Sequence, residues 1–306
     1  MDLGRTGAGR VSVLLERLVD DAGLFPPTAL APPDAVRRHR DDLAAGHPMH
    51  THRLLVAAGR LAQVRAELRP DDRFRIGLIA DGTASDDPGA RLTAALATIE
   101  ADPRLELALV EAPVAVFGPS PAAAVPVLLD AVHGTGVPLF LEPAAPTGID
   151  DLLAALPRAP GRVIGAKLRC GGTGAHLFPG TDDVARFIAA CVLAGVPFKA
   201  TAGLHHAVRH RNPATGFTHH GYLNLLLATA TACVEPAAPH RPGQDAVRAA
   251  LELTDTAELA DRIRALPATT AARARTLLFS YGSCSTGTPV NEAAAVLGLT
   301  RKDFTR

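Results

Sequence analysis

From about residue 50, short runs rich in aliphatic and β-branched residues alternate with longer runs in which Ala and Leu recur at helical spacing. Such alternation is typical of a parallel sheet with helices packed outside it. The runs expected to be strands are Arg53–Ala57, Phe74–Asp81, Leu105–Glu111, Val137–Glu142, Arg162–Arg169, Pro197–Gly203 and Thr276–Gly282. The expected helices between them include Ala90–Glu100, Pro121–His133, Ile149–Leu156, Asp182–Ala194, Gly221–Cys233 and Ala257–Leu266. An earlier strand near Leu18–Leu24, followed by a helix over Asp34–Ala45, brings the total to eight β/α units.

Eight such units in 306 residues fit a closed barrel better than an open sheet. No GxGxxG motif follows the early strands, which argues against a dinucleotide-binding open sheet. The sequence has no linker-like change in composition and no low-complexity segment. We therefore expect an α/β fold, a single (β/α)8 TIM barrel domain over residues 1–306, with an N-terminal extension and a C-terminal tail.

The period-two pattern of the strands predicts which side chains enter the barrel. In the run Arg162–Arg169, alternate positions form an apolar face that should pack on the helices, so Lys167 and Arg169 should point inward. The same pattern turns Lys199 inward from the next strand. Both lysines should face the carboxyl ends of the strands, where the active sites of such barrels lie. Glu111 and Glu142 end two earlier strands and should reach the same mouth.

Lysine is scarce in this chain. Of 31 basic residues, 28 are arginine, and the only lysines are Lys167, Lys199 and Lys302. A guanidinium cannot become a neutral nucleophile near neutral pH, whereas a buried amine can. Burial disfavours the charged form of a lysine, and a second ammonium about 6 Å away disfavours it by roughly 3 kcal/mol more. The neutral amine can then attack a carbonyl group and form an iminium.

The same lysines have a second interpretation, in which Lys167 or Lys199 forms an ion pair with Glu111 or Glu142, or binds a phosphate group of a ligand. Arg169 is ambiguous in the same way. Its guanidinium could hold a phosphate or carboxylate of the substrate in a bidentate contact, or pair with Glu142.

The stretch Ala166–Gly172, followed by Asp183–Gly195 and Phe198–Gly203, resembles strands six and seven of deoxyribose-phosphate aldolase, a class I aldolase barrel. The resemblance implies that Lys167 is the Schiff-base lysine and that Lys199 lowers its pKa. It also implies that Ala202-Gly203 and Gly282-Ser283 form phosphate-binding turns. The sequence departs from that family at Arg169, where the aldolases carry a small hydroxyl residue.

Over its whole length the chain resembles a group of bacterial proteins that share three patterns, and this second resemblance implies no particular activity. The shared patterns are Gly23–Pro27, Lys199–His206 and Tyr281–Ser285.

Five of the twelve histidines lie between His205 and His220. Such clustering indicates acid/base catalysis or a metal site. We expect His206 just past a strand and His220 at the start of a helix, where a neutral imidazole could polarise a carbonyl or move a proton. The alternative is that these are loop histidines that cap a helix. Within this cluster HxH and HExxH spacings are absent, and the chain has no paired cysteines, so we expect no structural zinc site.

The amino-acid composition bears on which kinds of binding partner and which cellular location are expected. The 31 acidic and 31 basic residues balance, which gives no electrostatic reason to expect nucleic acid or an anionic membrane as a partner. No stretch approaches 18 uninterrupted apolar residues. The four cysteines are widely spaced, and no apolar leader precedes them, so we expect reduced thiols and a cytoplasmic location. The oligomeric state stays open, with a homo-oligomer allowed.

The function that the sequence predicts is a class I aldolase-type lyase that acts on a small phosphorylated or carboxylated carbonyl compound, without a metal or organic cofactor. Lys167 would form the iminium, Lys199 would lower its pKa, and Glu111, His206 or His220 would move protons. The remaining positions would bind the anionic substrate: Glu142, Arg169, Gly171, Gly172, Thr201, Gly203, Gly282 and Ser283.

Two alternative functions remain open at this point. The first is a metal-dependent barrel isomerase or hydrolase that uses the His205–His220 cluster with Glu111 or Glu142. The second is a barrel that binds a ligand without catalysis.

Overall fold

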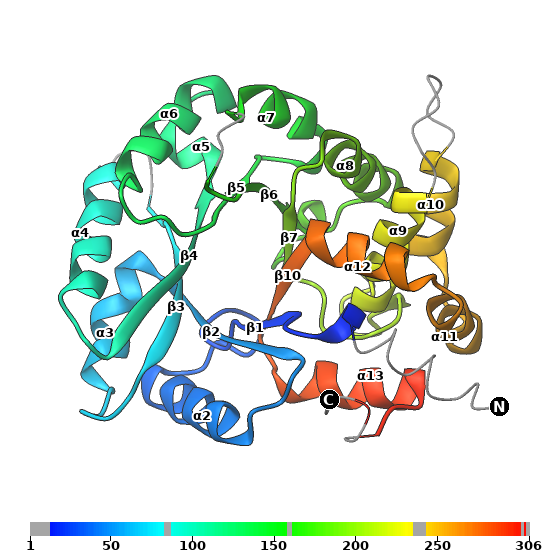
Figure 1. Ribbon diagram of the computed structural model, residues 1–306, viewed down its shortest axis with the longest axis horizontal. Helices are drawn as coiled ribbons and strands as arrows, with labels where there is room; N and C mark the ends of the chain where they lie inside the picture. The colour runs from blue at the N-terminus through cyan, green and yellow to red at the C-terminus, as the bar shows by residue number, and fades with distance from the viewer. Residues whose placement is uncertain (1–12, 83–86, 158–160, 235–242, 301–302, 304–306) are drawn as a thin grey trace.

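Eight parallel strands close into a barrel in the computed structural model, and the helices surround it (Figure 1). The structure describes residues 13–82, 87–157, 161–234, 243–300 and 303. The strands pair in the order β1-β10-β7-β6-β5-β4-β3-β2, so chain neighbours are also neighbours in the barrel once the separate β8–β9 hairpin is set aside. The predicted (β/α)8 barrel is confirmed. Its strands are β1 (Val19–Asp21), β2 (His50–Ala57), β3 (Phe74–Ile79), β4 (Leu105–Pro113), β5 (Leu139–Glu142), β6 (Ile164–Arg169), β7 (Phe198–Thr201) and β10 (Leu278–Ser283).

Helix boundaries follow from local chemistry. Helices α2, α4 and α6 begin with proline in the first turn, where the missing N–H has no intrahelical partner to lose. Helices α2, α8 and α13 end at Gly46, Gly195 and Gly298 in the left-handed conformation that favours glycine. The helices of the first half are α2 (Pro32–Ala45), α3 (Leu61–Ala66), α4 (Pro88–Glu100), α5 (Val114–Phe117), α6 (Pro121–Ala131) and α7 (Ile149–Ala155). Those of the second half are α8 (Thr181–Ala194), α9 (Tyr222–Val234), α10 (Gly243–Glu252), α11 (Thr256–Arg264), α12 (Ala268–Leu277) and α13 (Gly287–Leu297).

The connection between β7 and β10 is longer than the sequence pattern indicates. It contains the hairpin β8 (His210–Arg211) and β9 (Thr218–His219), followed by the helices α9 to α12, which gather on the right of Figure 1. Only two helices were expected there, and α13 was not expected. The N-terminal extension and most of the C-terminal tail that the sequence predicts lie outside the described residues.

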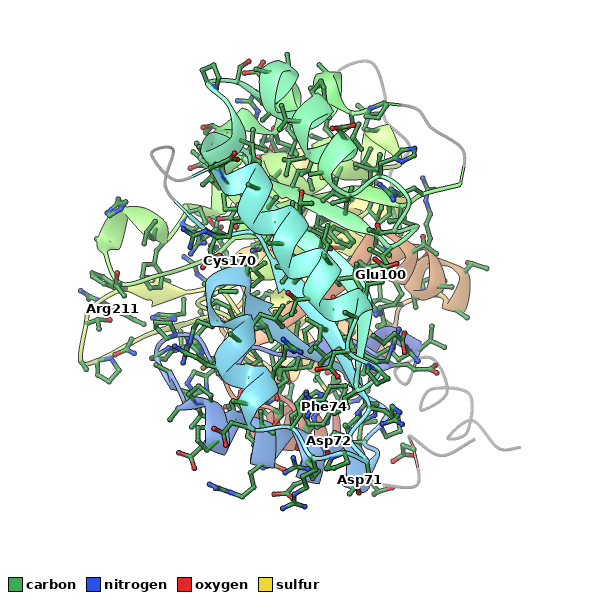
Figure 2. The ribbon with its side chains drawn as sticks, turned by 90° about the vertical axis from the view of Figure 1, so that its left-hand side faces the viewer. Asp71, Asp72, Phe74, Glu100, Cys170 and Arg211 are labelled. Carbon is green, nitrogen blue, oxygen red and sulfur yellow. The ribbon has the colours of Figure 1, made fainter. Side chains whose placement is uncertain are left out.

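The two ends of the barrel are distinct. Cys170 directly follows β6, and Arg211 lies on the β8–β9 hairpin. Figure 2 shows both residues on one side of the molecule. Asp72, Phe74 and Glu100, at the start of β3 and the end of α4, lie on the other side. The β→α loops and the projecting hairpin thus share the carboxyl end of the strands, where barrel enzymes place their active sites.

The apolar face of each strand packs on the helices, as the period-two pattern predicts. Ala166 and Leu168 of β6 are buried in this outer core, and Phe198 of β7 meets Phe187 of α8 edge to face at 5.8 Å. The inner face is filled partly by large side chains opposite glycines. Phe140 occupies the space beside Gly165, where an added Cβ would lie 2.6 Å from the Phe140 ring. Size complementarity thus fills this part of the barrel interior.

Candidate active site

Lys167 and Lys199 lie side by side in the barrel interior. The two residues are register partners on the neighbouring strands β6 and β7, and both side chains point inward. Glu111 of β4 lies between them, with Oε2 2.7 Å from Lys167 Nζ and Oε1 3.1 Å from Lys199 Nζ. All three side chains are buried. One carboxylate therefore bridges two adjacent ammonium groups.

Lys199 lies in a closed polar cluster below this bridge. It pairs with Asp20 of β1 and donates to Ser280 Oγ at 2.9 Å. Asp20 in turn accepts from Arg53 Nε at 2.7 Å and from Thr51 Oγ1 at 2.6 Å, and all of these groups are buried. The Lys199 amine is thus surrounded by partners and cut off from solvent.

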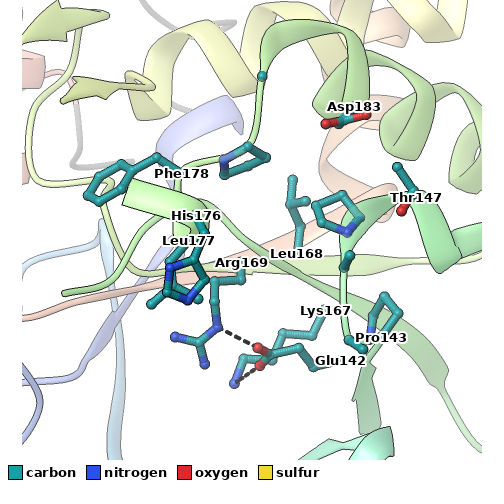
Figure 3. Close-up of a pocket in the computed structure, with 15 residues that line it drawn as sticks. Glu142, Pro143, Thr147, Lys167, Leu168, Arg169, His176, Leu177, Phe178 and Asp183 are labelled. Atoms are coloured by element: carbon teal, nitrogen blue, oxygen red, sulfur yellow. Dashed lines mark hydrogen bonds and ion pairs between the residues drawn. The ribbon is translucent and has the colours of Figure 1, made fainter. Parts of the chain in front are cut away.

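Lys167 is placed differently, because it faces the mouth of the barrel. Its Nζ lies 3.1 Å from Glu142 Oε2, and Arg169 Nε donates to Glu142 Oε1 at 2.6 Å (Figure 3). These three residues line a cavity of about 280 Å³ between the β5–α7 and β6–α8 connections. Lys199 does not line it. Of the two buried amines, only Lys167 is open to this cavity.

The charges in the network stabilise one another. Burial disfavours the charged form of Lys167, but Glu111 and Glu142 outweigh it and raise the pKa of this amine above its ordinary value. Burial likewise acts against ionised Glu111 and Glu142, yet the neighbouring cations hold the pKa of both carboxyls below the ordinary value. The pKa of Asp20 is lowered in the same way by Arg53 and Lys199. Lys167, Glu111, Glu142 and Asp20 are therefore ionised at neutral pH.

The expectation that Lys199 lowers the pKa of Lys167 is wrong. Glu111 intervenes between the two amines and interacts with both, so the carboxylates, which were also considered as partners, set the protonation of Lys167. The alternative interpretation, ion pairs to Glu111 and Glu142, describes the resting geometry. Arg169 likewise forms the expected pair with Glu142 while it also lines the cavity.

The structure brings neither His206 nor His220 to the Lys167 cavity. His206 is exposed beyond β7, where its Nδ1 lies 2.6 Å from Glu292 Oε1. His220 is buried, its Nε2 lies 2.9 Å from the Pro179 carbonyl oxygen, and burial lowers its pKa to about 4. His206 therefore contacts α13, and His220 contacts the β6–α8 connection.

The remaining histidines of the cluster lie close together on the β8–β9 hairpin side. His210 stacks on His219 with ring centroids 5.1 Å apart and meets His206 edge to face at 4.5 Å. A second, shallower cavity of about 370 Å³ lies beside His206, His210 and Glu292. Among the described residues, no group of three or more His, Cys, Asp or Glu side chains is arranged to hold a metal ion.

The glycine turns expected to hold an anion lie apart from the cavity. Gly203 has φ +69°, and its backbone touches the β6–α8 turn so closely that a Cβ on Gly171 would lie 2.7 Å from its Cα. Ser283 donates its hydroxyl to the Ser285 carbonyl at 2.6 Å. Gly171, Gly172, Thr201, Gly203, Gly282 and Ser283 are all at the carboxyl ends of β6, β7 and β10, but none lines the Lys167 cavity.

Sequence reasoning missed several parts of the site. Neither Asp20 nor Arg53 is among the residues that the sequence assigns to the site, although the alternation Thr51, Arg53 and Leu55 places the arginine on the inner face of β2. Sequence reasoning also missed His176 and Thr147, which line the cavity from the β6–α8 and β5–α7 connections. These two lie in connections that have no periodic pattern, so the sequence alone offered no signal for them.

Comparison with known proteins adds no relative: no protein-family model matches the chain, and no curated protein matches it significantly. Within the described part of the chain, no helix combines the length and the apolar character needed to cross a membrane. All four cysteines are buried as free thiols.

Proposed function

We propose that the protein is a lyase of the class I aldolase type, which binds a small carbonyl compound as an iminium on Lys167. The observation that carries this proposal is the position of Lys167, a buried amine open to a cavity at the carboxyl end of the barrel, with two carboxylates within 3.1 Å. The resemblance of the strand six and seven segments to deoxyribose-phosphate aldolase supports the same lysine.

The two carboxylates have different parts in this chemistry. Glu142 lines the cavity together with Lys167, whereas Glu111 does not line it, and Glu142 Oε2 lies 3.1 Å from Lys167 Nζ. It is therefore the group that accepts the ammonium proton and returns it to the departing oxygen. Glu111 is sealed between the lysines and fixes the position and charge of both. Lys199 acts through Glu111 and is a positioning residue.

Raising the pKa of Lys167 does not prevent nucleophilic attack. A proton transfer to Glu142 generates the neutral amine at the moment when a carbonyl carbon is in place, and the iminium that forms keeps a positive charge between the same two carboxylates. The site therefore favours the cation both before and after the amine reacts. The iminium then withdraws electrons from the adjacent carbon, which permits C–C cleavage or formation.

Exchange of carbonyl α-protons with solvent deuterium tests this proposal. Small aldehydes, 2-oxo acids and sugar phosphates are incubated with the full-length protein and a chelator, and exchange is followed by NMR. We expect exchange with at least one compound and its loss by about a thousandfold in Lys167→Met. Lys302→Met, which changes a lysine beyond the last barrel strand, is the control. Exchange that Lys167→Met retains, or that the chelator abolishes, would contradict the proposal.

A further inference from the structure

We propose that the substrate is a hydroxylated 2-oxo acid, with its carboxylate bound by Arg169 and its distal end unphosphorylated. The inference rests on the proposed iminium at Lys167 and names the compounds that this iminium would be built from. The inference is drawn from the side chains that line the cavity on the two sides of the Lys167 amine, Arg169 on one side and Asp183 with Thr147 on the other.

The first observation is the short gap between Lys167 and Arg169. Both contact Glu142, Lys167 through one carboxyl oxygen and Arg169 through the other. Because the two oxygens of a carboxyl group are about 2 Å apart, Lys167 Nζ and Arg169 Nε are at most about 8 Å apart. In a 2-oxo acid the carboxylate is bonded to the carbon that forms the iminium. Its oxygens then lie about 3–4 Å from the lysine nitrogen, and a hydrogen bond of about 2.9 Å from the guanidinium extends this span to about 6–7 Å. This length is compatible with the gap between Lys167 and Arg169.

The second observation is that Arg169 has donors to spare. Only its Nε donates to Glu142, and the terminal amino groups have no hydrogen-bond partner among the described residues. The side chain is 39% exposed and lines the cavity beside His176 (Figure 3). A planar guanidinium held at one edge is suited to a bidentate contact with a carboxylate.

The charge balance also favours an anion at this end. Four basic side chains (Arg53, Lys167, Lys199 and Arg169) and three acidic ones (Asp20, Glu111 and Glu142) form the connected network, which leaves one surplus positive charge. Arg169 is the member nearest to solvent, so a substrate carboxylate placed there neutralises the surplus.

The other end of the cavity has the opposite character. Asp183 in the first turn of α8 and Thr147 before α7 line it on the side away from Arg169 and His176 (Figure 3). A carboxylate and a hydroxyl can accept and donate hydrogen bonds to substrate hydroxyl groups. A phosphate brought to Asp183 would meet a like charge instead. The distal part of the substrate is therefore neutral and hydroxylated.

The covalent step is balanced within this set of groups. Glu142 takes a proton from the Lys167 ammonium, and the neutral amine adds to the 2-oxo carbon. The former carbonyl oxygen receives one proton from the amine and one that Glu142 returns, and it leaves as water. In cleavage, Glu142 then takes the proton of the C4 hydroxyl. The C3–C4 bond breaks, its electron pair moves to the iminium to give an enamine, and the distal fragment leaves as an aldehyde. Protonation at C3 and hydrolysis with one water release the 2-oxo acid.

Reductive trapping with two matched compounds tests the carboxylate site. Pyruvate and its neutral amide have nearly the same shape, and cyanoborohydride traps the iminium that either forms on the full-length protein. We expect pyruvate to label Lys167 at least about tenfold faster than the amide. The ratio of the two rates should fall about tenfold or more in Arg169→Gln and less in Arg169→Lys, which keeps the charge. Arg73→Gln, at the opposite end of the barrel, is the control and should leave the ratio as it is in the wild type.

Condensation of pyruvate with an aldehyde tests the distal end. We expect a higher kcat/KM with glyceraldehyde than with glyceraldehyde 3-phosphate, and a smaller difference between the two in Asp183→Asn. Labelling by the amide as fast as by pyruvate, or a preference for the phosphorylated aldehyde, would overturn the inference. The proposed function would still hold in that case if acetaldehyde labels Lys167. If no carbonyl compound, acetaldehyde included, labels Lys167, the proposed function fails and the inference fails with it.

Discussion

Lys167 and Glu111 form a buried ion pair across the barrel, with Nζ 2.7 Å from Oε2 and almost no exposure of either side chain. Glu111 is also the partner of Lys199, so this carboxylate allows two register-matched lysines to lie side by side. A buried pair gains little over an apolar replacement, but removing one member leaves an uncompensated charge. The ion pair is therefore best explained by its role at the site.

Replacing Glu111 by Gln should destabilise the fold strongly. The amide keeps the shape of the side chain but leaves two adjacent ammonium groups without their shared counter-ion, at an expected cost of about 3–5 kcal/mol. Urea unfolding measures this free energy. The control is Glu106→Gln on the same strand, whose pair with Arg75 is exposed and should be worth less than about 1 kcal/mol. Equal losses in the two variants would show that burial of the pair has no energetic weight.

The rate of iminium formation on the free protein should change little between pH 7 and pH 9. Glu111 and Glu142 raise the pKa of Lys167 above its ordinary value, despite burial, and the neighbouring cations lower the pKa of Glu142, so the two groups stay an ion pair over this range. The proton that leaves the amine passes to Glu142 within the pair, so the population that reacts does not depend on pH. Cyanoborohydride trapping with a saturating carbonyl compound measures this rate. A rise of about tenfold per pH unit would mean that solvent takes the proton and that Glu142 is not the base.

The sequence predicts the inner faces of β6 and β7 correctly because their outer faces are continuously apolar and pack on helices such as α8. The sequence also predicts correctly that Glu111 and Glu142 lie near these lysines. It does not predict which carboxylate lies between the amines, because that depends on strand tilt and register rather than on spacing along the chain. The β7–β10 connection was incomplete in the sequence-based assignment. α12 and the short hairpin have weak or interrupted periodicity, whereas α10 has a clear amphipathic pattern that the assignment left out. The same limitation explains why His206 and His220 were assigned to the site.

A methyl group on Gly165 should destabilise the barrel. Gly165 leaves room for the Phe140 ring, and a Cβ there would lie 2.6 Å from that ring and 2.4 Å from the Pro197 carbonyl oxygen. Overpacking of this kind costs about 1–3 kcal/mol. Gly287→Ala at the start of α13 is the matched control, because nothing lies within 4 Å of the added Cβ. Thermal unfolding of both variants decides the point, and a Gly165→Ala protein as stable as the control would contradict the packing described for the interior.

His220 should make stability fall on mild acidification. Burial lowers its pKa to about 4 in the folded protein, whereas an unfolded histidine titrates near 6.5. Between these values the unfolded chain binds the extra proton, so the contribution is complete above about pH 6.5 and is lost as pH falls toward 4. We expect the wild type to lose up to about 1.4 kcal/mol per pH unit more than His220→Gln over this range.

Urea unfolding at several pH values measures the difference in slope, with the exposed His133→Gln as a control that should follow the wild type. Identical slopes in wild type and His220→Gln would show that His220 titrates alike in the folded and unfolded protein.

The site of covalent labelling tests the account most directly. The protein is reduced with borohydride in the presence of pyruvate, digested, and its peptides are mapped by mass spectrometry. Because Lys167 alone of the two buried amines opens to the cavity, we expect the label on the peptide that contains Lys167 and none on Lys199. A label on Lys199, or no label on either lysine while the protein turns over a carbonyl substrate, would contradict the assignment of Lys167 as the nucleophile.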